Sequence, residues 1–206
     1  MPEEPRLKRA ITFIDGQNLY HCAREAFGCT HPNYDVMKLS RYVCESKGWH
    51  LRQARFYTGY PSTSDDAFWG GFWQRKLLAI TRQGAWKFSR PLRYRDKEFK
   101  LDDGTSILRR VAEEKGIDVR IAIDLIRLAL AGEYDVAVVF SQDQDLSEAT
   151  DEVKTISRQL NRWIRLACAY PVGTGTYNSR GINGTEWITI DDAAWQHCVD
   201  PIDYRP

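Results

Sequence analysis

Short runs of apolar, often β-branched residues alternate along the chain with longer amphipathic stretches. Residues 10–15 (AITFID) and 134–140 (YDVAVVF) have the pattern of buried strands, and residues 51–60 and 163–169 resemble them. Apolar positions at helical spacing predict helices over 17–27, 35–47, 65–83, 117–131 and 146–160, and a short strand at 187–190 precedes a last short helix. This alternation predicts an α/β fold with a mainly parallel sheet that is covered by helices on both faces.

The segment 82–100 (RQGAWKFSRPLRYRDKEFK) is both basic and aromatic. Seven of its nineteen residues are Lys or Arg, and four aromatic residues lie between them. We expect a hairpin insertion over 84–106, with its turn at residues 102–104. Two interpretations remain open: a hairpin with a charged outer and an aromatic inner face, or an arm that contacts RNA phosphates and stacks on bases. The residues chosen for the second interpretation are Arg90, Arg93 and Arg95.

The predicted helix over 65–83 begins with a dense group of aromatic side chains. These are Phe68, Trp69, Phe72 and Trp73. Aromatic residues at helical spacing usually supply packing area to a core. We therefore interpret the group as core rather than as a base-stacking surface.

Length and composition limit the classes of protein that fit. A chain of 206 residues with 43% hydrophobic and 28% charged residues suits one globular domain. The net charge of +1 means that any basic surface must be local. The five cysteines include no CxxC pair, which favours reduced thiols. No apolar run is long enough to span a membrane and no signal peptide is evident, so we expect a cytoplasmic protein.

Carboxylates lie at the carboxyl ends of two of the predicted strands. Asp15 ends the first run, and Asp143 and Asp145 lie in the turn SQDQDLS after the run 134–140. Each could simply cap a helix, Asp145 in the second case with Asp143 merely solvated. Two carboxylates this close repel one another, and a divalent cation removes that cost. Because strand ends of a parallel sheet meet at one edge, the sequence predicts an acidic cleft there.

Asp124 stands within the apolar helical run IAIDLIRLALA. A buried carboxylate costs several kcal/mol unless it is paired. Arg127 at i+3 could form an ion pair with it. The alternative is that Asp124 joins the acidic cleft, where one or two Mg²⁺ or Mn²⁺ ions could activate water and stabilise the leaving oxygen of a phosphodiester.

Three segments in order resemble the signature segments of a known family. FIDGQNLY (13–20), KGIDVRIAIDLI (115–126) and VVFSQDQDLSEA (138–149) resemble those of the NYN domain, in the bacterial LabA-like branch of the PIN-like nucleases. The resemblance runs from about residue 8 to the end. It implies a single PIN-like, Rossmann-like three-layer domain over 8–206 with a C-terminal extension at 170–206.

The resemblance also implies an aspartate-bound Mg²⁺ or Mn²⁺ centre that hydrolyses RNA. The matching positions are Asp15, Asp124, Asp143 and Asp145 for the metal and catalysis, with Asn18 and Ser141 as substrate or phosphate contacts. Gln142 and Gln144 depart from the family pattern, which commonly has Gly and a small residue there. The departure puts loop shape and substrate choice in doubt, while every carboxylate is kept.

Two further cations are candidates for phosphate contacts. Lys115 opens the second signature segment, and Arg180 lies in the Gly-rich stretch NSRGINGT. Surface cations of this kind are more often simply solvated.

The preferred interpretation is therefore a metal-dependent endoribonuclease whose partner is RNA. An RNA-binding or regulatory adaptor with a vestigial metal pocket is the main alternative. Asp143-Gln-Asp145 could also be the DxD of a nucleotide-sugar transferase, although no sugar-nucleotide signature accompanies it. A homodimer is compatible with the sequence, which does not determine the oligomeric state.

Overall fold

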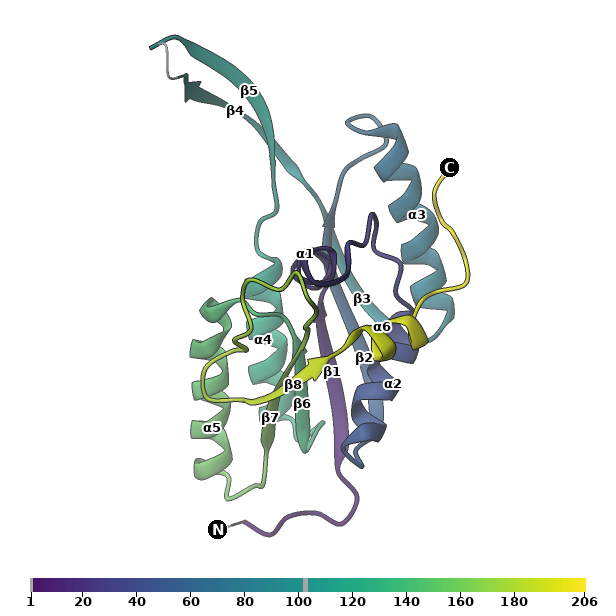
Figure 1. The fold of residues 1–206 in the computed structure, drawn as a ribbon. Coiled ribbons are helices and arrows are strands. Elements are labelled where there is room, and N and C mark those ends of the chain that lie inside the picture. The colour runs from purple at the N-terminus through teal and green to yellow at the C-terminus, as the bar shows by residue number, and fades with distance from the viewer. Residues whose placement is uncertain (1, 102–103) are drawn as a thin grey trace.

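The computed structural model describes residues 2–101 and 104–206, and it is built on a central sheet of six strands (Figure 1). The strand order is β3-β2-β1-β6-β7-β8, and every neighbouring pair is parallel. The strands are β1 Arg9–Asp15, β2 His50–Tyr60, β3 Trp86–Pro91, β6 Val136–Phe140, β7 Arg165–Pro171 and β8 Glu186–Ile190. The mainly parallel sheet predicted from the sequence is confirmed.

Helices cover both faces of this sheet and enclose two hydrophobic cores. On one face lie α1 (Gly16–Phe27), α2 (Val36–Ser46), α3 (Ala67–Arg82) and the short α6 (Asp192–His197). On the other lie α4 (Ile117–Leu130) and α5 (Ser147–Gln159), with the 3-10 turn η1 (Gln144–Leu146) before α5. The buried strands supply side chains alternately to the two cores, as a sheet enclosed on both faces requires. The expected three-layer α/β architecture is confirmed.

The order of the strands reverses between β1 and β6. From β1 the chain builds outward through β2 to β3, and it then returns to place β6 on the other side of β1. Ligands of parallel sheets bind outside the carboxyl ends of the strands at such a switch point. Asp15 is the last residue of β1, and Ser141 directly follows β6.

A separate antiparallel hairpin projects from the body at the carboxyl end of the sheet (Figure 1). It consists of β4 (Arg93–Lys100) and β5 (Ser106–Glu113). The bounds expected for the hairpin, 84–106, were wrong, because residues 86–91 instead form the edge strand β3 of the central sheet. Trp86 and Phe88 pack against the core beneath α4, which accounts for this pairing. Of the turn expected at 102–104, Asp102 and Asp103 lie outside the described residues.

The aromatic group at the start of α3 divides between core and surface. Phe72 and Trp73 are buried, whereas Trp69 is half-buried and Phe68 is 44% exposed. Core packing therefore explains only part of the group. Across the described residues, no helix is long and apolar enough to cross a membrane.

Candidate active site

Asp15 lies at the switch point, where β1 ends and α1 begins. One of its carboxylate oxygens accepts a hydrogen bond from the Asn18 backbone N–H at 3.0 Å, so it caps α1. The other oxygen lies 3.5 Å from the Ser141 hydroxyl, which donates to it. Only 7% of the residue is exposed. Burial, and next the nearby charge of Asp143, raise the pKa of Asp15 to about 6.

Asp143 lies in the loop after β6, close enough for its charge to act on Asp15. Its carboxylate caps η1 by accepting from the Asp145 backbone N–H at 3.0 Å. The Ser141 hydroxyl accepts from the Asp143 backbone N–H at 3.2 Å, so the same hydroxyl contacts both segments. Asp145 is exposed beside this pair. The cap in this turn is thus Asp143, not Asp145 as the capping interpretation assumed.

Two carboxylates that the sequence reasoning missed extend this acidic edge. Glu114 lies between β5 and α4 and accepts from the Gly59 backbone N–H. Burial raises the pKa of Glu114 to about 7, and the charges of Asp15 and Asp118 add to the rise. Asp118 is in the first turn of α4, where a negative charge suits the helix dipole.

The place of Asp118 in the first turn of its helix could have identified it from the sequence. Helices that connect parallel strands run back against the sheet, so their first turns lie at the carboxyl ends of the strands. Asp124 is six residues further along α4 than Asp118, which places it roughly 9 Å deeper along the helix axis. The first Asp of KGIDVRIAID, not the second, is therefore the one near the strand ends.

Asp124 occupies a different environment from the one expected for a metal ligand. It is fully buried, and one oxygen lies 3.1 Å from Arg55 and 2.9 Å from the Tyr57 hydroxyl. The other oxygen lies 3.1 Å from Arg120 and 3.4 Å from Arg127. Arg55 in turn stacks on Trp86, with its guanidinium carbon 3.8 Å from the ring centroid. Both oxygens are thus already neutralised, and the structure supports the ion-pair interpretation with Arg127, enlarged by two more arginines.

Asn18 joins the two halves of the site. Its side-chain oxygen accepts from the Gln142 backbone N–H at 2.9 Å, linking the start of α1 to the loop after β6. The same oxygen lies 3.5 Å from the Cys22 thiol. Asn18 therefore connects the segment that begins with Asp15 to the loop that carries Asp143. These contacts give it a positioning role within the described structure.

The two glutamines that depart from the family pattern hold the Gly-rich loop against the site. The Gln142 amide donates to the backbone oxygens of Asn178 and Arg180, both at 2.8 Å. The Gln144 amide donates to the Gly181 oxygen at 3.0 Å. Side chains as small as Gly could not make these bonds. The backbone of Arg180 is thereby held beside the site, while its side chain is exposed.

Three of the candidate phosphate contacts lie together near Glu114. Arg90, Arg93 and Lys115 line a hollow of about 480 Å³ with Pro91 and Leu92. No carboxylate of the described residues lines it, although Lys115 lies 3.4 Å from Glu113 at its border. Arg95 lies further out on the hairpin, 3.8 Å from Glu113. A cationic hollow therefore adjoins the acidic edge.

The donor set at the switch point fits a hard divalent cation. Apart from residues 1, 102 and 103, which are not described, no three His, Cys, Asp or Glu side chains form a complete metal-binding group. Mg²⁺ seldom uses a complete protein cage, because it keeps several waters and binds through one or two carboxylates and the substrate phosphates. Asp15 and Asp143 supply that pair. Burial and, after it, the repulsion by Asp143 raise the pKa of Asp15, and a bound cation would offset both costs.

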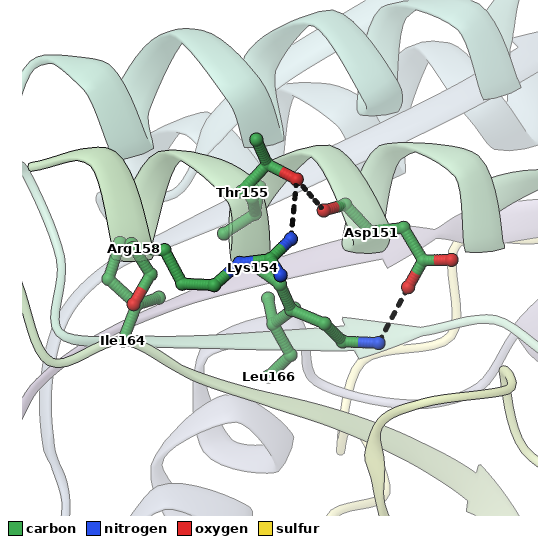
Figure 2. A pocket seen from close by; sticks show the side chains of 8 residues that line it. Asp151, Lys154, Thr155, Arg158, Ile164 and Leu166 are labelled. Atoms are coloured by element: carbon green, nitrogen blue, oxygen red, sulfur yellow. Dashed lines mark hydrogen bonds and ion pairs between the residues drawn. The ribbon is translucent and has the colours of Figure 1, made fainter. Parts of the chain in front are cut away.

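A larger hollow lies elsewhere, between α5 and the start of β7 (Figure 2). Its volume is about 520 Å³, and an ion pair between Lys154 and Asp151 crosses its wall at 2.6 Å. Ile164 and Leu166 line it at the amino end of β7. It is thus remote from the carboxyl ends of the strands and is not part of the acidic edge.

Comparisons with known proteins place the chain in a family. A protein of unknown function from Vibrio parahaemolyticus, known from its crystal structure, is 21% identical with a TM-score of 0.54, and the match covers 92% of this chain and 97% of that one. Ribokinase from Giardia lamblia is 10% identical with a TM-score of 0.39, over 85% and 53% of the chains, and carries no argument. No curated protein matches. The model of the NYN domain matches residues 9–164. The chain therefore belongs to the NYN domain family, whose members are typically nuclease-like.

Proposed function

We propose that this protein is a metal-dependent ribonuclease of the LabA-like branch, with Mg²⁺ or Mn²⁺ held by Asp15 and Asp143. The observation that carries the proposal is the position of these two residues at the switch point of the sheet, where the Ser141 hydroxyl donates to the Asp15 carboxylate and accepts from the Asp143 backbone N–H. NYN nuclease domains generally use divalent metals. Asp145, Asp118 and Glu114 complete the acidic edge, and Asp124 is left out of it.

Different residues of the site have different roles in the proposed hydrolysis of a phosphodiester. When bound, the cation supplies charge stabilisation and lowers the pKa of water. Asp15 and Asp143 would hold it, with the Asp15 carboxylate oriented by the Ser141 hydroxyl and the Asn18 N–H, and the Asp143 carboxylate by the Asp145 N–H. Glu114, with a pKa of about 7, holds a proton at a carboxyl oxygen near neutral pH. That value suits a group that exchanges a proton with the reacting oxygens.

RNA phosphates fit the cationic hollow beside this edge. Arg90, Arg93 and Lys115 would bind the backbone, with Arg95 further along the hairpin and Arg180 on the opposite loop. Phosphate contacts of this kind position a strand without reading its sequence. The choice of RNA over DNA rests on the family resemblance.

The direct test is cleavage of labelled RNA by the purified protein in Mg²⁺ or Mn²⁺. Asp143→Asn should lower the rate by more than about a hundredfold, because even the outer partners of metal ligands typically cost 10–100-fold. Asp151→Asn, an exposed substitution on the remote face of α5, is the matched control and should cleave normally. Equal cleavage by wild type and Asp143→Asn would point to a contaminating nuclease and refute the proposal.

The RNA-binding adaptor is the second outcome of this experiment. It would bind RNA with unchanged affinity after Asp143→Asn and show no cleavage in either form. The exposed cations of the hairpin would serve such an adaptor equally well. Metal titration separates the two, because an adaptor with a vestigial pocket would bind no Mg²⁺ or Mn²⁺.

A further inference from the structure

A small aromatic hollow lies directly beside the acidic edge, on the side of α1 and α3. Its volume is about 190 Å³. The lining residues are Gly16, Gln17, Tyr20, His21, Pro32, Trp69 and Trp73. Drug-sized ligand sites are commonly 300–1,000 Å³, so this hollow suits one planar ring system rather than a whole nucleotide.

Core packing explains only part of this aromatic lining, because Trp73 is buried in the core whereas Trp69, which packs against the core, keeps exposed surface. Phe72 is fully buried, and it packs edge-on against both Trp69 and Trp73 at 5.4 and 5.3 Å between ring centroids. Trp69 nevertheless remains half-buried, with part of its surface in the hollow. Tyr20 is half-buried as well, and its hydroxyl is anchored on the Thr30 oxygen at 3.1 Å. Both rings are therefore held in place with surface left to cover.

The hollow adjoins the carboxylates through the chain itself. Gly16 and Gln17 follow Asp15 directly, and the Gln17 amide donates to the Gly59 oxygen at 3.3 Å. The N–H of the same Gly59 donates to Glu114, which precedes Lys115 of the cationic hollow. The aromatic hollow and the cationic hollow thus flank the acidic edge on two sides.

The chemistry of the lining selects an uncharged, flat ligand. Within residues 2–101 and 104–206, no carboxylate, Lys or Arg lines the hollow. Its one imidazole, His21, has its pKa lowered by burial and by the neighbouring Arg24, which favours the uncharged form. A nucleobase has such a flat, uncharged face, and unpaired bases stack on aromatic side chains.

We propose that this hollow binds one unpaired nucleobase of the RNA, next to the phosphate that is cut. The inference rests on the proposed function and narrows the substrate to single-stranded RNA or to RNA with an unpaired nucleotide at the cleavage point. A base that is paired in a duplex could not enter the hollow. The aromatic residues of α3 would then divide by role, with Phe72 in the core and Trp69 toward substrate.

The test is a coupling experiment between the hollow and single bases. Short labelled single-stranded RNAs, each with one nucleotide made abasic, are titrated in EDTA, and their binding is followed by fluorescence anisotropy. In the wild type one abasic position should weaken binding by roughly tenfold, within the range expected for one lost stack. In Trp69→Leu that penalty should disappear, because the base no longer has a partner.

Control variants separate the base contact from a general loss of structure. Trp69→Phe keeps an aromatic face and should retain most of the penalty. Phe68→Ala removes the exposed neighbouring ring, which does not line the hollow, and should keep the full penalty. The melting temperature of each variant shows whether it is folded. Tyr20→Leu tests the opposite wall should Trp69→Leu fail to fold.

The outcomes distinguish this inference from the function on which it rests. If the wild type neither binds nor cleaves any of the RNAs, the proposed function fails. If it binds and cleaves them but shows the same abasic penalties as Trp69→Leu, the hollow has another occupant and only this inference is overturned.

Discussion

At the scale of single residues, two buried aspartates, Asp15 and Asp124, have different roles. Asp15 is buried with a carboxylate neighbour, and its pKa is raised to about 6. Asp124 is buried with three guanidinium groups and a phenol around it. A buried carboxylate next to another is destabilising and available to a cation, whereas a fully paired one is structural. The surroundings therefore assign the two roles.

Asp15→Asn should stabilise the metal-free protein at high pH. The folded state keeps the Asp15 and Glu114 protons to higher pH than the unfolded state, whose pKa values are about 4. Between about pH 4 and 7 the folded state thus binds more protons, and stability falls as pH rises. The variant should melt a few degrees above wild type at pH 8 and at a similar temperature at pH 4. If Asp15→Asn and wild type melted at the same temperature at both pH values, the destabilising charge assigned to Asp15 would be contradicted.

Asp124→Ala should destabilise the fold without removing the metal site. It leaves Arg55 buried without its partner, which typically costs about 3–5 kcal/mol. We expect thermal denaturation roughly 6–20 °C lower than in wild type. Mn²⁺ affinity of the folded protein, measured by calorimetry at low temperature, should be unchanged. A stable variant that did not bind Mn²⁺ would show instead that Asp124 is a ligand of the metal.

At the scale of elements, the hairpin has two different faces. Directly opposed residues of an antiparallel pair share a face. One face carries Arg93, Arg95, Lys97 and Arg109 with the single acid Glu113, whereas the other carries two acids and two bases. The hairpin projects from the body of the protein (Figure 1), and an ion pair between Arg110 on the second face and Asp65 at 3.4 Å connects the two. Because of this difference in charge, we expect the face with Arg93, Arg95 and Arg109 to contact RNA.

Paired double variants test this assignment. Arg95→Gln with Arg109→Gln removes two charges from the basic face, and Lys100→Gln with Arg110→Gln removes two from the other. Each phosphate contact to single-stranded nucleic acid contributes about 0.7 to the slope of log K against log salt. The first variant should therefore lower the slope by about 1.4, and the second by clearly less. Equal changes would show that the two faces do not differ in RNA binding.

The strands and helices could be predicted from the sequence more reliably than the contacts between them. The buried runs at β1 and β6 identified the central strands, and with them Asp15 and Asp143. Trp86 and Phe88 were placed in a hairpin because alternation alone does not distinguish a hairpin strand from the edge strand of a larger sheet. Asp124 was misplaced because helical spacing does not show that Arg55, from a distant strand, meets it.

At the scale of the whole molecule, a net charge of +1 conceals a strong local separation of charge. Carboxylates gather at the switch point of the sheet, and cations gather along the hairpin and its base. A strand of RNA crossing this edge would have its backbone over the cations and one phosphate over the carboxylates. The reaction at that phosphate would then need a metal cation between it and the carboxylates.

The most direct test of the account is a crystal soaked in Mn²⁺, with the ion located by its anomalous scattering. The account predicts an ion bound by carboxylate oxygens of Asp15 and Asp143 at roughly 2.1 Å, a distance typical of octahedral oxygen coordination. An ion coordinated by Asp124, or no ion near Asp15 and Asp143 at saturating Mn²⁺, would contradict it.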